Sequence, residues 1–349
     1  MLRQSLRRLV ADQRGTACSQ IRRGLATVAG QRNFVKIVEV SPRDGLQNEK
    51  AIVPTETKVK LVNWLLKAGV SVVEAGSFVS PKWVPQMADT PQVIQEMQIK
   101  SGVSYPVLVP NAKGLDTLLS ILSSDSWATR QKPTDEIAIF TAATESFTKA
   151  NTNCTIAESL ERLSQVTQRA RDNQLKVRGY ISVVAGCPYE GAVDAKRVGQ
   201  IAKELLQMGC YEVSLGDTVG VATPPEMIAV LDACVQAGVP VDALAAHCHD
   251  TFGMGLANVL TMVRAGVRTV DSSVGGLGGC PYSPGATGNI DTESVVYALH
   301  KEGYETGIDL SEAARIGDWI SNAIGRLNSS NAGRAIIARE RLQKEKAKL

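Results

Sequence analysis

Apolar and polar residues alternate regularly along most of the chain. From residue 34 onward, short runs rich in Val, Ile and other apolar residues recur, and each is followed by a longer segment in which apolar residues return every three to four positions. Short β-branched runs are typical of buried strands, and the second spacing is typical of helices with one apolar face. The alternation therefore predicts parallel strands joined by helical crossovers.

Eight such runs predict eight strands, at residues 34–40, 70–75, 105–110, 136–142, 177–184, 211–216, 243–249 and 269–274. Helical segments between them, such as 55–69, 195–209 and 224–238, close on Gly, as helices often do. Eight strand–helix units within residues 31–308 predict an α/β fold, a (β/α)8 TIM barrel, which needs roughly 250 residues. Residues 309–349 look helical and charged, and we expect these extra C-terminal helices to lie over one end of the barrel.

A doubly wound open sheet is the competing fold. It usually has fewer strands and, where it binds dinucleotides, carries a GxGxxG turn after the first strand. This chain instead has SPRDGLQ at residues 41–47, and it shows no linker that would indicate a second domain. The pattern therefore favours the barrel.

Charge and hydropathy exclude two classes of partner. The chain has 349 residues, 44% of them hydrophobic, and a formal net charge of +3. Residues 1–30 hold six arginines and one aspartate, a net +5, which leaves −2 for the remainder. The body therefore lacks the broad positive field that nucleic acid binding requires. No apolar run reaches the roughly 18 residues of a membrane span, so we expect no membrane partner either.

The two ends of the chain carry targeting patterns. An Arg-rich, acid-poor start is typical of a mitochondrial presequence, and we predict that residues 1–30 are cleaved. The last three residues, 347–349, read AKL, close to the SKL peroxisomal address, although a Lys-rich helix end is an equal alternative. Seven cysteines without paired spacing indicate a reducing compartment. We therefore expect the mitochondrial matrix, with the peroxisome as a second location.

Polar residues gather where the predicted strands end, and this is the catalytic end of a TIM barrel. His247 and His249 stand two apart on a predicted strand in a chain with only three histidines. Residues i and i+2 of a strand point to one face, so both imidazoles can bind one cation. Asp44 from across the barrel and the carbonyl oxygen of Asn289 would complete the set, and ligand softness alone favours Mn, Fe, Co or Zn over Mg. A pair of core histidines is the alternative.

Further candidates flank this predicted metal site. Arg43 would place a fixed cation beside it, able to stabilise an oxyanion or enolate, unless Arg43 only forms a structural pair with Asp44. Glu74 and Asp217, at strand ends, are able to orient a ligand, transfer a proton or pair with Arg43. Lys149, in a segment expected to be a loop (141–153), is a candidate for contact with a phosphate, although most loop lysines only solvate the surface.

Cys280 lies in a loop that holds five glycines between Gly275 and Gly285. Glycine lets a loop move and approach a ligand closely, which suits a lid that brings a proton donor or acceptor onto a substrate. An incidental cysteine in a Gly-rich turn is the alternative. Cys187 lies in an identical GCPY string at residues 186–189, where packing or cofactor contact is expected, so the string alone is not diagnostic.

Five motifs resemble the hydroxymethylglutaryl-CoA lyases: VEVSPRDGLQNEK (38–50), VEAGSF (73–78), SLGDTVG (214–220), AHCHD (246–250) and GGLGGCPYSPGATGN (275–289). The HxH pair and the RDG turn are shared with a wider superfamily of metal-dependent lyases and Claisen-type synthases, whereas the GGLGGCPY loop is more specific to the lyases. The resemblance runs from about residue 34 to residue 310 and covers the whole predicted barrel.

The resemblance implies a set of site residues and partners. A divalent cation, Mg or Mn rather than a softer metal, would be bound by Asp44, His247, His249 and Asn289. Positions that match catalytic and active-site residues of the family are Arg43, Glu74, Asp217, His247 and Cys280, and Gln47 matches a position near the substrate. An acyl-CoA substrate and a homodimer are also implied.

The implied reaction splits 3-hydroxy-3-methylglutaryl-CoA into acetoacetate and acetyl-CoA, in leucine catabolism and ketone-body formation. His247 or Asp217 would take the hydroxyl proton, Arg43 would stabilise the enolate, and Cys280 would take part in its protonation. A Claisen-type isopropylmalate or homocitrate synthase would use a similar metal site, but these enzymes usually carry a long C-terminal extension that this sequence lacks. A non-catalytic binding barrel would not need these groups together.

Overall fold

The computed structural model describes residues 33–127, 131–279 and 288–347. Contacts divide the chain into two units, residues 1–34 and residues 35–349, and every helix and strand given below belongs to the second. The predicted presequence, Cys280 and the last two residues of the chain lie outside the described residues.

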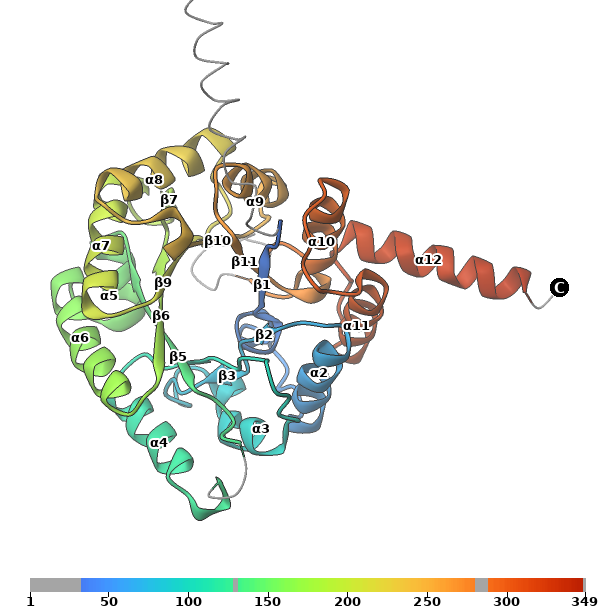
Figure 1. The fold of residues 1–349 in the computed structure, drawn as a ribbon, viewed down its shortest axis with the longest axis horizontal. Helices are drawn as coiled ribbons and strands as arrows, with labels where there is room; N and C mark the ends of the chain where they lie inside the picture. The colour runs from blue at the N-terminus through green and yellow to red at the C-terminus, as the bar shows by residue number, and fades with distance from the viewer. Residues whose placement is uncertain (1–32, 128–130, 280–287, 348–349) are drawn as a thin grey trace, which may run out of the picture. The chain divides into compact units, whose positions relative to one another are not determined.

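Each of the eight predicted runs contains a strand, so the barrel prediction is confirmed (Figure 1). The strands are β1 (Lys36–Glu39), β2 (Val72–Val73) with β3 (Gly76–Ser77), β4 (Val107–Leu108), β5 (Glu136–Ala142), β6 (Lys176–Ser182), β9 (Glu212–Asp217), β10 (Leu244–Cys248) and β11 (Thr269–Ser272). All pairings among them are parallel, in the order β2-β1-β11-β10-β9-β6-β5-β4-β3.

The second barrel strand is interrupted, and the interruption lies where the sheet closes. β2 pairs with β1, whereas β3 pairs with β4. Between them, the backbone N–H of Glu74 donates to the carbonyl of Glu39, and that of Ala75 donates to the carbonyl of Pro106. The stretch therefore bonds to both neighbours and completes the ring of strands.

Helices surround the barrel, connecting successive strands up to β11, with α10 following that last strand (Figure 1). They are α2 (Thr55–Lys67), α3 (Thr90–Glu96), α4 (Ala112–Leu122), α5 (Glu145–Thr152), α6 (Ile156–Asp172), α7 (Ala195–Met208), α8 (Pro224–Gln236), α9 (Gly255–Arg264) and α10 (Thr292–Lys301). Gly69, Gly209 and Gly238 have positive φ just after α2, α7 and α8, which confirms the predicted helix ends. The prediction of a loop at residues 141–153 was wrong, because α5 occupies most of this segment.

Short elements fill the connections. These are the π-helical turn η1 (Ser41–Gly45), the 3-10 turns η2 (Pro85–Met87), η3 (Asp125–Trp127), η4 (Val241–Ala243) and η5 (Val274–Gly276), and the antiparallel hairpin β7 (Gly186–Cys187) with β8 (Gly191–Ala192). Within the described ranges, no helix is both long and apolar enough to cross a membrane.

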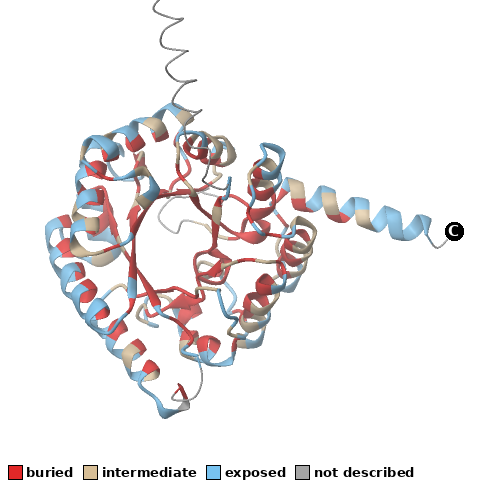
Figure 2. Cartoon of the chain, in the orientation of Figure 1, coloured by how far each residue is buried: buried red, intermediate tan, exposed pale blue. Residues whose placement is uncertain are grey.

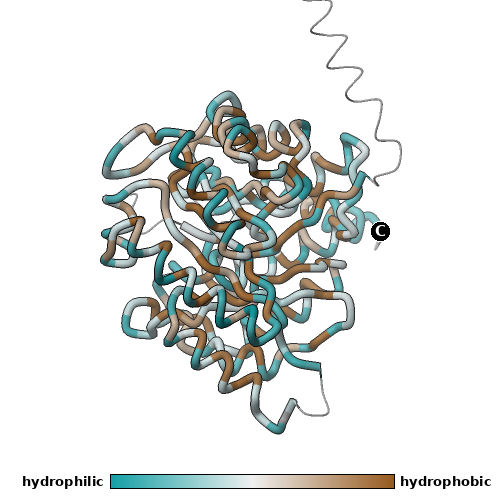
Figure 3. The backbone as a smooth tube through the Cα atoms, turned by 60° about the vertical axis from the view of Figure 1, so that its left-hand side comes forward, coloured by the Kyte–Doolittle hydropathy of each residue, from teal (hydrophilic) through white to brown (hydrophobic). Residues whose placement is uncertain are grey.

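Two layers of different chemistry lie on the two faces of the barrel strands. Apolar side chains such as Ile139 and Leu215 form the core shared with the surrounding helices. The barrel strands are coloured mostly as buried in Figure 2, and hydrophobic segments alternate with hydrophilic ones along the chain in Figure 3. The inside of the barrel holds charges: Arg178 of β6 binds Asp271 of β11, two strands that are not neighbours in the sheet, so the contact crosses the interior. Both side chains are 1% exposed or less. The interior therefore holds a buried network of charges, whereas branched aliphatic filling is common in this fold.

The C-terminal helices α11 (Leu310–Ala323) and α12 (Asn331–Lys346) confirm the helical prediction for residues 309–349. α11 packs against α2, α10 and η5, with the rings of Trp64 and Trp319 5.2 Å apart. It therefore lies in the outer helical layer beside α2 and also contacts η5, which follows the carboxyl end of β11 (Figure 1).

Candidate active site

The candidate metal ligands come from two well-separated parts of the chain. Asp44 lies in η1, directly after β1, while His247 lies in β10 and His249 just beyond its end. η1 is a five-residue π-helical turn that begins Ser41–Pro42, and single π turns recur at functional sites. These positions are the carboxyl ends of barrel strands, where the sequence predicted them.

Asp44, His247 and His249 form a buried cluster whose ligand atoms all lie within 4.8 Å of one another. The Oδ2 atom of Asp44 is 3.9 Å from Nε2 of His247 and 3.8 Å from Nε2 of His249. The two imidazole centroids are 5.4 Å apart, whereas Cys248 packs in the apolar core. The prediction that the two histidines share a face is therefore confirmed, and the two-nitrogen, one-carboxylate set suits a divalent cation.

Asn289 is held beside this cluster by the backbone. It forms a bridge with His249, flanked by hydrogen bonds from Asp250 N–H to the Gly288 carbonyl and from Ile290 N–H to the Cys248 carbonyl. Its side-chain amide donates to Asp44 at 2.9 Å. Among the described residues, no donor meets the buried Asn289 carbonyl oxygen. A buried carbonyl oxygen without a donor is costly unless a cation binds it, so Asn289 fits the predicted ligand set.

Asp44 is held ionised by its neighbours. Burial opposes its charge, but Arg43 and the two histidines together bring the pKa of Asp44 below its usual value. Arg43 Nη1 donates to Oδ1 at 2.6 Å, and the Gln47 side chain donates to the same oxygen at 3.3 Å. Oδ2 of Asp44 thus faces the two histidines, while Oδ1 is held by Arg43 and Gln47. Gln47 was predicted to lie near the substrate, and the structure places it next to Asp44, a candidate metal ligand.

Arg43 is fixed from a second side by Glu74. Arg43 Nε donates to one Glu74 oxygen, the Tyr180 hydroxyl donates to the other, and the Glu74 side chain is 0% exposed. Burial alone would lower the pKa of Arg43, but Glu74 and Asp44 raise it above its ordinary value, so the guanidinium stays charged. Tyr180 also places its ring 5.4 Å from the guanidinium carbon of Arg43. Glu74 therefore orients Arg43.

Sequence patterns missed Asp271, Arg178 and Tyr180. Asp271 accepts from Arg178 and contacts Nδ1 of His247 at 3.1 Å, and the Tyr180 ring meets the His247 ring edge-on at 5.8 Å. Burial opposes the charge of Asp271, yet Arg178 and His247 lower its pKa. The sequence did hold a signal for these contacts. Each of two buried strand runs contains a charged residue, and a buried charge requires a partner inside the barrel.

Asp217 lies apart from this cluster. Its register partner in β10 is Cys248, which packs in the apolar core, and its two carboxylate oxygens accept from the backbone N–H groups of Val221 and Ala222. Burial raises the pKa of Asp217, although those N–H groups oppose the rise. The carboxylate thus orders the loop before α8.

Two further predicted positions lie on α5 and in the β7–β8 hairpin. Lys149 is exposed on α5, a helix rather than the expected loop. Cys187 is buried in the β7–β8 hairpin and accepts from the Thr144 hydroxyl at 3.2 Å, consistent with packing. Cys280 lies outside the described residues.

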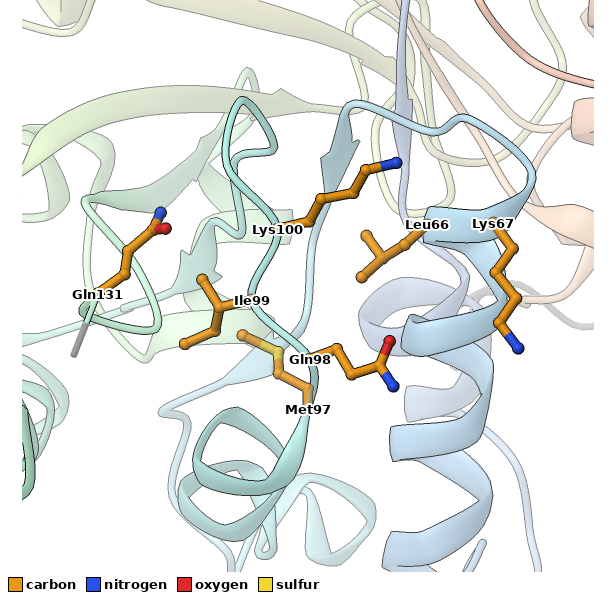
Figure 4. Close-up of a pocket in the computed structure, with 7 residues that line it drawn as sticks. All are labelled: Leu66, Lys67, Met97, Gln98, Ile99, Lys100 and Gln131. Carbon is orange, nitrogen blue, oxygen red and sulfur yellow. The ribbon is translucent and has the colours of Figure 1, made fainter.

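A cavity of about 630 Å³ lies away from these groups (Figure 4). It is lined by the end of α2 at Leu66 and Lys67, by residues 97–100 between α3 and β4, and by Gln131 ahead of β5. These segments lead into strands, so the cavity lies at the amino end of the barrel and has no part in the cluster described above.

A parallel eight-stranded barrel whose carboxyl end holds a buried Asp–His–His cluster beside a fixed arginine defines a metal-binding barrel enzyme. Comparison with known proteins gives the family. The HMGL-like family model matches residues 34–320, and the chain belongs to this family.

Relatives with assigned names are similar over most of their length. The mitochondrial hydroxymethylglutaryl-CoA lyase of Bos taurus is 52% identical over 301 residues, 86% of this chain and 89% of that protein. The cytoplasmic 3-hydroxy-3-methylglutaryl-CoA lyase of Rattus norvegicus is 49% identical over 308 residues, 88% of this chain and 86% of that protein.

Solved structures agree with these relatives. The hydroxymethylglutaryl-CoA lyase of Pseudomonas aeruginosa superposes with a TM-score of 0.83 at 45% identity, covering 88% of this chain and 99% of that one. An HMG-CoA lyase from Acinetobacter baumannii, solved with coenzyme A and 3-methylmalate, superposes with a TM-score of 0.81 at 31% identity, covering 88% and 97%.

Proposed function

We propose that this protein is a lyase that cleaves 3-hydroxy-3-methylglutaryl-CoA into acetoacetate and acetyl-CoA. The observation that carries the proposal is the buried Asp44–His247–His249 cluster at the carboxyl end of the barrel, in a chain about half identical to named lyases along most of its length. The reaction would serve leucine catabolism and ketone-body formation, and a divalent metal is its expected cofactor.

We assign the metal to Asp44, His247, His249 and Asn289, with Mg or Mn as the expected ion. A bound divalent cation would supply Lewis acidity and lower the pKa of a coordinated hydroxyl group. The donor set supports this assignment, because it combines two imidazole nitrogens, a carboxylate held ionised and a buried carbonyl oxygen that lacks a donor among the described residues.

Cleavage requires the substrate hydroxyl to lose its proton, the adjacent carbon–carbon bond to break as a ketone forms, and the enolate of acetyl-CoA to gain a proton. Arg43 is our candidate to stabilise the developing negative charge, because its guanidinium is charged, buried and fixed before substrate arrives. Glu74 and Tyr180 hold that guanidinium in place. A preorganised donor needs no reorientation as the charge appears.

Two groups were candidates to remove the hydroxyl proton. Asp217 caps the loop before α8 with both of its oxygens, so an ordering role suits it better. His247 lies within the Asp44 cluster, and we assign it to cation binding rather than proton removal, because an imidazole that binds a cation through Nε2 and donates from Nδ1 has no lone pair left for the hydroxyl proton. Cys280 keeps its predicted role in protonating the enolate.

An acyl-CoA ligand is the expected substrate class. The Acinetobacter baumannii relative, solved with coenzyme A, supports this expectation. Gln47 beside Asp44 and the exposed Lys149 on α5 are our candidates for contacts to the thioester ligand. We also propose the mitochondrial matrix as the location, supported by the name of the Bos taurus relative, and a homodimer, which light scattering of the purified protein would test.

Chromatography of thioesters tests the reaction direction. Incubation with 3-hydroxy-3-methylglutaryl-CoA and Mg should convert that thioester to acetyl-CoA, whereas acetyl-CoA with a 2-oxo acid should release no free coenzyme A. The opposite pattern would make the protein a Claisen-type synthase.

A further inference from the structure

Asp271 is the one carboxylate that meets Nδ1 of His247 within the described residues. It lies in β11 and is 0% exposed. Its carboxylate contacts side chains from three other strands: Arg178 of β6, Ser214 of β9 and His247 of β10. The contact with His247 follows from the barrel itself, because the parallel register pairs His247 directly with Asp271.

The other two partners leave Asp271 only an acceptor role. Arg178 donates from both terminal nitrogens, at 3.2 and 2.7 Å, and the Ser214 hydroxyl donates to Oδ2 at 2.7 Å. Arginine has no acceptor atom and keeps its charge, so a carboxylate held by its fork stays ionised. A further group at Oδ2 must therefore bring a proton of its own.

His247 Nδ1 lies 3.1 Å from that oxygen. A neutral imidazole carries one proton, and if it were on Nε2 the bare Nδ1 lone pair would face a carboxylate lone pair at hydrogen-bond distance. We infer that Asp271 is a positioning residue that holds His247 in the tautomer protonated on Nδ1, so that the Nε2 lone pair faces Asp44. This inference deepens the proposed function, since only an unprotonated nitrogen binds a cation.

Arg178 and Glu212 make the arrangement rigid and also supply a control. Arg178 Nε donates to Glu212 at 2.7 Å, and Glu212 also accepts from Lys36 and Thr269. Glu212 is buried, 3% exposed against 0% for Asp271, and shares its arginine, and none of its hydrogen bonds involves His247. Neutralising Glu212 therefore removes the same charge from the same network without touching the imidazole.

Nitrogen NMR of protein labelled at its histidines measures the tautomer directly. The chain has three histidines, so three imidazole signals arise, and His249→Gln and His300→Gln assign them by loss. In the metal-free protein we expect a proton on Nδ1 of His247. A bare Nδ1 with the proton on Nε2, or averaging of the proton between the two nitrogens, would overturn the inference.

Variants then test the positioning role through metal affinity. Asp271→Asn should shift the His247 signal towards the Nε2-protonated form and weaken Mn binding about 10- to 100-fold, measured by electron paramagnetic resonance of free Mn. Glu212→Gln should leave both close to wild type. Equal weakening in the two variants would show a general charge effect and contradict the role, and the wild-type spectrum decides the tautomer even if Asp271→Asn does not fold.

The two proposals fail in distinguishable ways. Protonation on Nδ1 without thioester cleavage would sink the proposed lyase and leave the positioning role standing. Cleavage by a protein whose His247 carries its proton on Nε2 would do the reverse.

Discussion

Replacing Arg43 by Met removes the cation that lies between two buried carboxylates. The Arg43 side chain is 7% exposed, Glu74 is 0% and Asp44 is 12%, and the guanidinium donates to both. Methionine keeps the unbranched shape of the stem but provides no charge, so Glu74 retains only the Tyr180 hydroxyl as a side-chain donor in this network.

This environment sets the expected size of two effects, one on the free energy of unfolding and one on kcat. Breaking a buried ion pair by removing one partner costs about 3–5 kcal/mol, because the remaining charge stays desolvated. Loss of a preorganised donor to a developing anion costs about 2.7–4 kcal/mol, roughly 100- to 1,000-fold in kcat. Metal should also stabilise Arg43→Met more than wild type, since Asp44 then has no arginine to neutralise it.

Urea unfolding, followed by tryptophan fluorescence with and without Mn, measures the free energy of unfolding and its stabilisation by metal. Acetoacetate release at saturating thioester measures kcat. Arg315→Met is the matched control: Arg315 also pairs with two carboxylates, Glu312 and Glu340, but is 40% exposed. That control should change the free energy of unfolding by about 0–1 kcal/mol. If Arg43→Met kept kcat within about tenfold of wild type, the proposed enolate-stabilising role would be refuted.

Three further variants probe the surroundings of the site. Asp217→Asn should lower kcat by about tenfold or less, the lower end of general-base effects, because we assign Asp217 to loop order; a loss above about 100-fold in a folded variant would return it to proton removal. Tyr180→Phe should lower the free energy of unfolding by about 1.5–3 kcal/mol in urea titrations, since its hydroxyl binds a buried carboxylate, and an unchanged midpoint would contradict that contact. Burial raises the pKa of Glu293, which accepts from the Gly275 N–H. The folded protein therefore holds that proton more tightly, and stability falls as pH rises through the folded-state pKa, so Glu293→Gln should lose stability less steeply than wild type as pH rises above the ordinary glutamate pKa.

The strands and the metal cluster were readable from the sequence because they depend on local patterns. β-branched runs separated by helical periodicity fix strand number, and the HxH spacing places His247 and His249 on one face whatever the rest of the barrel does. Asp44 was predictable because β1 ends just before it. Strand ends meet at one edge of any parallel barrel, so residues far apart in sequence were correctly brought together.

Contacts that cross the barrel could not be predicted from the sequence. Arg178 and Asp271 are 93 residues apart, and the pattern of a strand does not say which charge another strand supplies. Asp217 was selected because it ends a strand, but its register with Cys248 turns it away from the cluster. α5 was missed because it is short and rich in Thr and Asn, and it is held by burying Phe147 and Thr148 rather than by propensity.

The most direct test of the account is acetoacetate release from 3-hydroxy-3-methylglutaryl-CoA by protein lacking residues 1–30, after chelation and after Mg or Mn is restored. We expect no release from the chelated protein, recovery with either ion, and a large loss in Cys280→Ala at unchanged metal affinity. Absence of release with every ion, from protein that circular dichroism shows to be folded, would contradict the proposed lyase.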